Sequence, residues 1–371
     1  MRIVIDGRMT GERWTGIGLY GRRLIEQLQQ IDRENEYVVL LARTEFDQWQ
    51  STAPNFKPVL ANYRVYGLAE QLLLPFKLLG LRPDLVHFLH FNAPCLWRGR
   101  RVVTIHDLTL FDYSTTTKTG LARLPYTLKN WGMRWIVGWV VSDARVVTPT
   151  EATKDKLIKR YDRGLWRVKA RNVTVTPEAV DLPEKLPAHS LTHRPAKLLY
   201  VGNLYPHKNV TTLIKAMPMI RRALPGTTLS IVGQTPGFGD RLKQQAVDLG
   251  LGEAVKFEGF VAPGDLTELY AAATVFVFPS LAEGFGLPPL EAMAQGTPVL
   301  AARASCLPEV LGSAADFFDP TDPSDLARNA IELLNDPKKL VQLQTKGFAH
   351  IKSFSWQRMA EQTLGVYKSR V

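Results

Sequence analysis

Residues 279–298, with the sequence PSLAEGFGLPPLEAMAQGTP, combine two glutamates with a glycine-rich turn. Gly284 and Gly286 let the backbone approach a ligand closely, and amide groups at the start of the helix that follows can bind anionic oxygens. Glu283 and Glu291 lie on either side of that anion site, where carboxylates accept hydrogen bonds from hydroxyls. A phosphate flanked by such carboxylates describes a sugar nucleotide. The alternative, an acidic surface loop with a helix-capping glutamate, fits either glutamate alone but not their joint spacing.

Residues 201–210, with the sequence VGNLYPHKNV, follow a short apolar run and lead into a helix. Lys208 places a point charge where a diphosphate would lie, and a positive group there stabilises a departing nucleoside diphosphate. Asn203 and His207 belong to the same loop. A solvated helix N-terminus is the alternative, and it fits His207 better than Lys208.

Two further segments come from the first half of the chain. Residues 102–108, VVTIHDL, deliver His106 and Asp107 at the end of a buried strand, where the histidine can donate to a sugar hydroxyl and the acid can orient it. Gly16 and Gly18 lie in a turn that follows the first strand and opens a helix. Both segments also fit purely structural roles.

These segments resemble glycosyltransferase family 4, whose signature is two glutamates eight positions apart within EGFGLPxLEAMAxGxPV. The signature is nearly complete between Glu283 and Val299. The resemblance continues through CLPEVLGSAADFFDP and the FSW of residues 354–356. It covers nearly the whole chain and is most specific over residues 198–371.

The resemblance implies a retaining enzyme of the α/β GT-B fold, with two Rossmann-like parallel-sheet domains facing each other across a cleft. In the family, the first glutamate contacts the transferred sugar, the glycine amides contact its ring and phosphate, and the second glutamate contacts the ribose. The family's histidine–acid pair faces the sugar, and its GFV loop meets the base. The catalytic residues implied are Glu283, Lys208 and His106. The donor-binding residues implied are Gly16, Gly18, Asn203, His207, Lys208, Phe260, Val261, Glu283, Gly284, Phe285, Gly286, Leu287 and Glu291.

Short apolar runs that alternate with amphipathic ones predict the elements that position these residues. In the first half we expect strands at 2–5, 37–41, 85–89, 102–105, 144–147 and 173–175, with helices at 18–30, 69–79, 121–140 and 151–161. In the second half we expect strands at 198–201, 229–232, 255–258, 275–278, 298–301 and 315–318, with helices at 210–222, 240–249, 263–272, 288–295, 325–334 and 338–352. The predicted domains are an acceptor domain at 1–185, a linker at 186–196, a donor domain at 197–353, and a final helix at 354–371 that crosses back to the first domain.

Composition narrows the class of protein. The chain has 371 residues, 45% of them hydrophobic, and two cysteines, Cys95 and Cys306, too far apart for a zinc motif, so we expect a reducing compartment. No Asp-x-Asp pair occurs, so we expect neither a metal nor another cofactor, only a GDP- or UDP-linked sugar as substrate. No apolar run is long enough to span a membrane, and no signal segment is visible, so we expect a cytoplasmic protein.

The net charge of +11 is concentrated in residues 51–171, which hold 20 Lys and Arg against 8 Asp and Glu. A helix in this part carries Trp131, Trp135 and Trp139 at a spacing of four, with Lys129 and Arg134 nearby. Together with Asp107, these residues predict an acceptor surface that meets an anionic membrane, on the inner face of the plasma membrane. A core-facing stripe is the alternative.

The sequence therefore predicts a hexosyltransferase, for mannose or a related sugar, that acts on a lipid-linked or polysaccharide acceptor in cell-envelope glycan synthesis. Two other classes stay open. A sugar-nucleotide 2-epimerase has the same architecture, although it lacks the spacing of the two glutamates. A basic nucleic-acid-binding protein would fit the charge, but the best-defined motifs lie in the nearly neutral half, so we expect no nucleic acid as partner.

Overall fold

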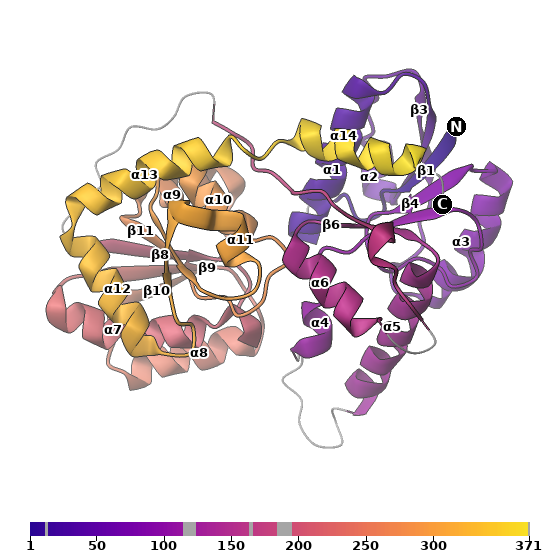
Figure 1. Ribbon diagram of the computed structural model, residues 1–371. Coiled ribbons are helices and arrows are strands. Elements are labelled where there is room, and N and C mark those ends of the chain that lie inside the picture. The colour runs from indigo at the N-terminus through magenta and orange to yellow at the C-terminus, as the bar shows by residue number, and fades with distance from the viewer. Residues whose placement is uncertain (12–13, 114–123, 163–165, 184–194, 370–371) are drawn as a thin grey trace. The chain divides into compact units, whose positions relative to one another are not determined.

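The computed structural model describes residues 1–11, 14–113, 124–162, 166–183 and 195–369 (Figure 1). The chain divides into two compact units. Unit 1 consists of Met1–Phe111, Gly120–Glu178 and Ser355–Val371, and unit 2 of Asp112–Thr119 and Ala179–Phe354. The stretch of unit 1 that starts at Gly120 ends at Glu178, and the domain boundary expected at 185 stays a prediction. The expected linker at 186–196 lies almost entirely outside the described residues.

Unit 1 is built on a sheet of seven parallel strands in the order β3-β2-β1-β4-β5-β6-β7. The strands are β1 (Arg2–Asp6), β2 (Glu36–Leu41), β3 (Phe56–Leu60), β4 (Leu85–Phe88), β5 (Arg101–Thr104), β6 (Arg145–Thr148) and β7 (Val173–Val175). Sequence patterning missed β3, which contains Pro58. A proline cannot donate to a neighbouring strand, and β3 accommodates it because it lies at the edge of the sheet.

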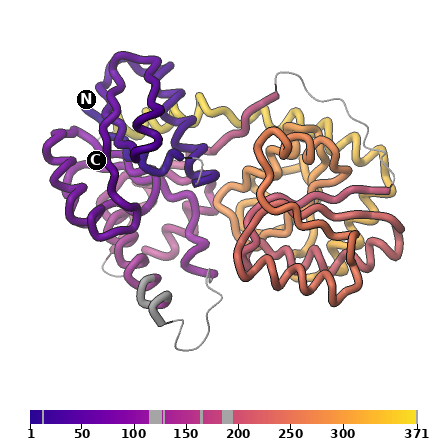
Figure 2. The backbone as a smooth tube through the Cα atoms, turned by 180° about the vertical axis from the view of Figure 1, so that it is seen from behind, coloured from indigo at the N-terminus to yellow at the C-terminus, as the bar shows by residue number. Residues whose placement is uncertain are grey.

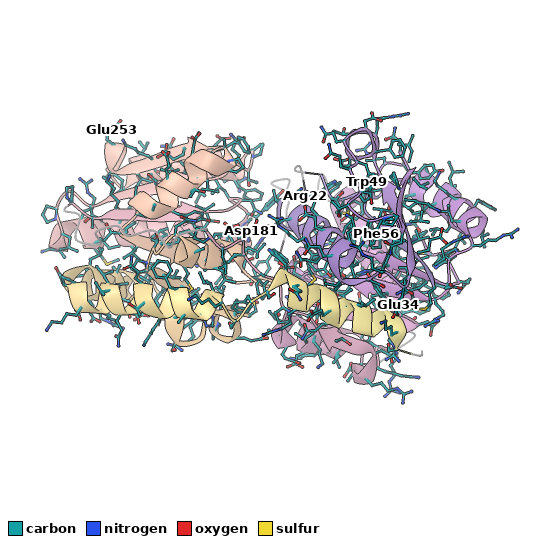
Figure 3. All side chains as sticks on the ribbon, turned by 90° about the horizontal axis from the view of Figure 1, so that it is seen from above. Arg22, Glu34, Trp49, Phe56, Asp181 and Glu253 are labelled. Atoms are coloured by element: carbon teal, nitrogen blue, oxygen red, sulfur yellow. The ribbon has the colours of Figure 1, made fainter. Side chains whose placement is uncertain are left out.

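Helices from both ends of the chain surround this sheet. They are α1 (Thr15–Ile31), α2 (Arg43–Asp47), α3 (Leu68–Leu81), α4 (Thr109–Asp112), α5 (Leu124–Ser142), α6 (Glu151–Arg160) and α14 (Trp356–Lys368), with the 3-10 helix η3 (Ala170–Asn172). The C-terminal helix α14 lies beside α1 (Figure 1), and both chain ends belong to unit 1 (Figure 2). Lys368 at the end of α14 lies 3.6 Å from Glu34. Glu34 is labelled in Figure 3.

A histidine inside unit 1 attaches α14 to the sheet. His87 on β4 is fully buried, its Nδ1 lies 2.6 Å from the hydroxyl of Tyr367, and its Nε2 lies 2.9 Å from the hydroxyl of Thr104. Burial and the nearby His106 lower the pKa of His87 to about 3. His87 is therefore a neutral core residue, and a C-terminal segment completes the fold of the N-terminal unit.

Unit 2 contains six parallel strands in the order β10-β9-β8-β11-β12-β13. The strands are β8 (Lys197–Val201), β9 (Thr228–Val232), β10 (Val255–Gly259), β11 (Val275–Phe278), β12 (Val299–Ala302) and β13 (Ala315–Phe318). The helices are α7 (Val210–Ala223), α8 (Phe238–Asp248), α9 (Pro263–Ala272), α10 (Leu287–Ala294), α11 (Leu307–Leu311), α12 (Pro323–Asn335) and α13 (Pro337–Ile351), with the 3-10 helices η4 (Pro206–Lys208), η5 (Gly252–Ala254) and η6 (Gly312–Ala314).

The two sheets share one topology. In each, the first strand of the unit lies between the second and the fourth, so the strand order reverses between β1 and β4 in unit 1 and between β8 and β11 in unit 2. In open α/β sheets, ligands bind beyond the carboxyl ends of the strands at such a reversal point. The fold is thus the predicted α/β class with two Rossmann-like parallel sheets, as in GT-B proteins. The described helices include none that is long and apolar enough to cross a membrane.

Candidate active site

The centre of the site in unit 2 is an ion pair between two predicted catalytic residues. Lys208 Nζ lies 2.6 Å from Glu283 Oε1, and the side chains are 13% and 11% exposed. Lys208 follows β8 and Glu283 follows β11, the two neighbouring strands at the reversal point of the sheet. Residues separated by 75 positions in the sequence therefore meet where the topology favours ligand binding.

The backbone around Lys208 is fixed by hydrogen bonds to neighbouring loops. The main-chain oxygen of His207 accepts from the amide of Leu281 at 2.8 Å and from the hydroxyl of Ser280 at 3.3 Å. Asn209 has a left-handed backbone, and its side-chain amide donates to the main-chain oxygens of Pro279 at 3.2 Å and Pro320 at 2.8 Å. These bonds hold the lysine loop against the glutamate loop before any ligand arrives.

The glycine turn after Glu283 leads into α10 and supplies amide donors. Gly286 has a φ of +92°, a conformation that other residues avoid, and a Cβ there would lie 3.0 Å from Leu307. Positions 288 and 289, in the first turn of α10, are both prolines and have no N–H to donate. The anion site expected from the sequence must therefore depend on the amides of the glycine turn more than on the helix end.

Glu291, the predicted ribose ligand, lies in the first turns of α10 and is held by a tyrosine. The hydroxyl of Tyr270 on α9 donates to Glu291 Oε2 at 2.8 Å, and Tyr270 is buried. Burial raises the pKa of Glu291, while the bond from Tyr270 opposes that rise. The second carboxylate oxygen is left to accept from a ligand, so Tyr270 orients Glu291.

The other residues predicted to bind the donor vary in exposure. Phe285, Leu287, Gly284 and Gly286 are buried in the turn, and His207 is buried with its ring stacked on Tyr205. The side chain of Asn203 is exposed, and its main-chain oxygen accepts from the Tyr200 hydroxyl at 2.7 Å. Phe260 is exposed and Val261 partly exposed after β10, which suits the backbone contacts to a base that the resemblance implies.

The site residues predicted in the first half of the chain belong to unit 1. His106 follows β5, with Nδ1 2.9 Å from Glu178 Oε1 and Nε2 3.0 Å from the main-chain oxygen of Leu89. A carbonyl oxygen only accepts, so Nε2 donates to the main-chain oxygen of Leu89, and Nδ1 faces the carboxylate of Glu178. Both polar atoms of the ring are thus occupied inside unit 1, and a contact with a sugar would need one of them to exchange partners.

Asp107 and the glycine turn have clear local roles. Asp107 Oδ1 accepts from the amide of Thr109 at 2.7 Å and so stabilises the start of α4. Gly16 and Gly18 lie in the first turn of α1, which begins one residue earlier than Gly16. A Cβ on Gly18 would come within 2.5 Å of the main-chain oxygen of Gly11, so a glycine is needed there for packing alone.

The tryptophans of α5 do not form one uniform face. Trp131 and Trp135 are exposed, whereas Trp139 packs against Trp166 and donates from its indole N–H to the main-chain oxygen of Cys95 at 3.0 Å. Arg134 is exposed and its guanidinium donates to the main-chain oxygen of Phe111. The side chain of Lys129 lies outside the described part of α5. The core interpretation therefore holds for Trp139, and the membrane interpretation stays a prediction for the exposed tryptophans.

Sequence reasoning missed several residues that support the site. Asn209 stood in a recognised motif without an assigned role. Tyr270 and Glu178 had no sequence signal, because each acts through a partner from a distant part of the chain. Among the described residues, no group of three or more His, Cys, Asp or Glu side chains could hold a metal ion.

Comparison with known proteins identifies the family of the chain. The profile described as "Glycosyltransferase Family 4" matches residues 14–184, and the one described as "Glycosyl transferases group 1" matches residues 183–350. The chain belongs to glycosyltransferase family 4 and is a glycosyltransferase.

Individual relatives cover almost the entire chain. An O-antigen chain mannosyltransferase B of Escherichia coli is 28% identical over 375 residues, which span 95% of this chain and 96% of the relative. A sucrose-phosphate synthase from Thermosynechococcus elongatus has a TM-score of 0.77 at 20% identity, covering 99% of this chain and 98% of that one. Anabaena HepE in complex with UDP-glucose has a TM-score of 0.74 at 20% identity and full coverage of both chains. The likeness to the two solved structures concerns the fold.

Proposed function

We propose that this glycosyltransferase transfers a hexosyl group, mannose or a related sugar, from a GDP- or UDP-linked donor with retention of configuration. The acceptor is a lipid-linked or polysaccharide glycan of the cell envelope, on the cytoplasmic side of the membrane. The observation that carries the proposal is the contact between Lys208 and Glu283 at the reversal point of the second sheet. The relative whose name includes an O-antigen mannosyltransferase supports the sugar and the acceptor class.

The ion pair suits a nucleotide-sugar donor because the donor carries a group that each side chain can bind: a diphosphate for Lys208 and sugar hydroxyls for Glu283. The ammonium of Lys208 can turn to the diphosphate, and Glu283 can then accept from sugar hydroxyls. In the step that we propose, the bond between the sugar C1 and the phosphate oxygen breaks as the acceptor oxygen attacks C1 from the same face. The departing diphosphate takes the acceptor proton, and Lys208 with the glycine amides stabilises its charge without a metal ion.

A panel of GDP- and UDP-sugars tests the donor assignment without knowledge of the acceptor. We expect one donor to raise the melting temperature and to be hydrolysed slowly, in the presence or absence of EDTA. The Lys208→Ala variant should lose both effects, while Lys215→Ala, which removes an exposed lysine of α7, should keep them. Chromatography of the released sugar separates the classes, because an epimerase would yield an altered sugar.

Stabilisation by no nucleotide sugar, or equal effects of the two lysine variants, would contradict the proposal. Loss of hydrolysis after metal removal would contradict its metal-independent part.

A further inference from the structure

Helix α3 of unit 1 presents an apolar side to solvent along its whole length. Five of its large side chains are exposed to fractions of 81%, 54%, 49%, 70% and 61%, namely Leu68, Leu72, Leu73, Phe76 and Leu79. We call these five the α3 apolar surface. The two other exposed residues of the helix are Ala69 and Gly80, so no polar side chain interrupts the arc.

The opposite side of α3 is apolar except for the buried Glu70. Leu74, Pro75 and Leu78 are buried against the core of unit 1. A surface helix normally alternates an apolar stripe with a polar face, and one that is apolar all round is normally buried on all sides. Helix α12 shows the usual pattern in the same chain, since its exposed residues are Ser324, Arg328, Glu332 and Asn335. The exposed side of α3 is therefore built for contact with something apolar.

Neighbouring segments extend this surface. Gln71 of α3 accepts from the amide of Cys95 at 3.0 Å, and the main-chain oxygen of Cys95 accepts from Trp139 of α5. Leu96, the next residue, is 57% exposed. The loop that contains Cys95 is hydrogen-bonded to both α3 and α5, and it adds the exposed apolar side chain of Leu96.

The segment that carries this surface has more basic than acidic residues. Residues 63–82 contain three basic residues, Arg64, Lys77 and Arg82, and one acidic residue, Glu70. Glu70 is fully buried and lies 2.7 Å from the guanidinium of Arg8, so it contributes no exposed negative charge. The accessible charge of residues 63–82 is therefore positive, and the exposed Asp84 just after them accepts a hydrogen bond from the amide of Arg2.

The combination of an apolar arc and a positive border fits one partner. A second copy of the chain would bring like charges together, which is unfavourable in a self-complementary contact. A bilayer with anionic headgroups instead takes the leucines and the phenylalanine into its acyl boundary and neutralises the basic residues.

We infer that α3 lies in the interfacial region of an anionic membrane and holds unit 1 there. This inference deepens the proposed function by naming the surface that meets the membrane. The inference rests on the proposed function in one respect: a lipid-linked acceptor would lie in the membrane that α3 contacts. It assigns the main contact to α3, and not to the tryptophans of α5.

Flotation of the full-length protein with vesicles tests the inference. We expect binding to vesicles of equal parts phosphatidylglycerol and phosphatidylcholine at low salt, and much weaker binding to pure phosphatidylcholine. A Leu72→Ser/Phe76→Ser variant should bind the anionic vesicles at least about tenfold more weakly, because two inserted side chains are lost. The matched control Val247→Ser/Val341→Ser changes side chains of unit 2 that are 65% and 52% exposed, and should bind as wild type.

A charge variant, Arg64→Glu/Lys77→Glu, should also bind weakly and lose the salt dependence of wild type. The inference is wrong if the control weakens binding as much as the α3 variant, or if wild type binds no vesicle. It is also wrong if wild type sediments as a dimer that the α3 variant converts to a monomer, since a second copy then covers the surface.

Donor hydrolysis without vesicles separates the two proposals. The α3 variant should hydrolyse the donor at the wild-type rate, which also shows that it is folded. Hydrolysis without membrane binding would overturn only the inference about α3, whereas membrane binding without hydrolysis of any donor would overturn the proposed function.

Discussion

Each unit places a close pair of polar side chains after strands of its parallel sheet, but the two pairs differ in the polar atoms that they leave available. In unit 2, Lys208 contacts Glu283, and an ammonium has three N–H groups to share. In unit 1, His106 contacts Glu178 through one ring nitrogen and a main-chain oxygen through the other, so the ring has no further polar atom. Two pairs of similar burial therefore differ in how many polar atoms they leave available to a ligand.

The two halves of the chain also differ in net charge. The expected donor motifs lie in a nearly neutral part of the chain, whereas the basic excess lies in residues 51–171, the part of the sequence that contains α3. If both proposals hold, Lys208 supplies positive charge for the chemistry and the basic residues near α3 supply it for membrane binding.

The largest effect should come from the pair in unit 2. Lys208→Ala and Glu283→Ala should each lower kcat for transfer by a factor of about 100 to 1,000, because charge stabilisation and sugar positioning are lost. The double variant should be little worse than either single variant, since the two residues act together. Steady-state kinetics with the donor found in the panel measures this.

Glu253→Ala, which removes an exposed glutamate of unit 2, is the control and should retain full activity (Figure 3). Near-wild-type turnover of Lys208→Ala or Glu283→Ala would contradict the catalytic role that we assign to the pair in unit 2.

An intermediate effect, on stability, should come from the pair in unit 1. Glu178→Ala leaves a buried imidazole nitrogen without its acceptor and should lower the free energy of unfolding by about 1–3 kcal/mol. All eight tryptophans belong to unit 1, so their fluorescence during urea unfolding follows that unit alone.

Glu26→Ala removes an exposed partner of Arg23 and should change stability by less than about 0.5 kcal/mol. An equally small change for Glu178→Ala would show that the contact between His106 and Glu178 is not needed for stability. The structural role that we assign to this pair would then be wrong.

The smallest effect should come from Tyr270→Phe, which removes the hydrogen bond to Glu291. We expect the donor KM to rise about 3- to 10-fold with kcat nearly unchanged. Burial already raises the pKa of Glu291, and loss of the bond from Tyr270 raises it further. The carboxylate is then protonated at a higher pH as the pH falls, so the acid limb of kcat/KM moves to higher pH in the variant.

A donor without ribose hydroxyls provides the check on this role. Wild type and Tyr270→Phe should bind such a donor equally, because Glu291 then has nothing to hold. A difference as large as with the intact donor would show that Tyr270 acts through the fold and not through the ribose contact. Tyr63→Phe, in unit 1, should leave the KM for either donor unchanged.

Much of the fold followed from local patterns in the sequence. Alternation of apolar runs with amphipathic ones predicted nearly every strand of both sheets, because a buried parallel strand needs apolar side chains on both faces. The strand β3 was not predicted because its proline breaks that pattern. The proline is acceptable because β3 lies at the edge of the sheet. The turn of residues 284–286 was predictable because glycines at close spacing favour a turn, and Gly286 has a positive φ that other residues avoid.

What the sequence determined by itself was the class of chemistry, since the residue types around Glu283 and Lys208 and their spacing along single loops are local properties. The tertiary structure decided which residues cooperate. It joined Lys208 to Glu283, Glu291 to Tyr270 and His106 to Glu178, pairs whose members come from different strands or helices. It also left one side of α3 exposed. Contacts of this kind depend on how distant elements pack, and no local pattern of residues records that.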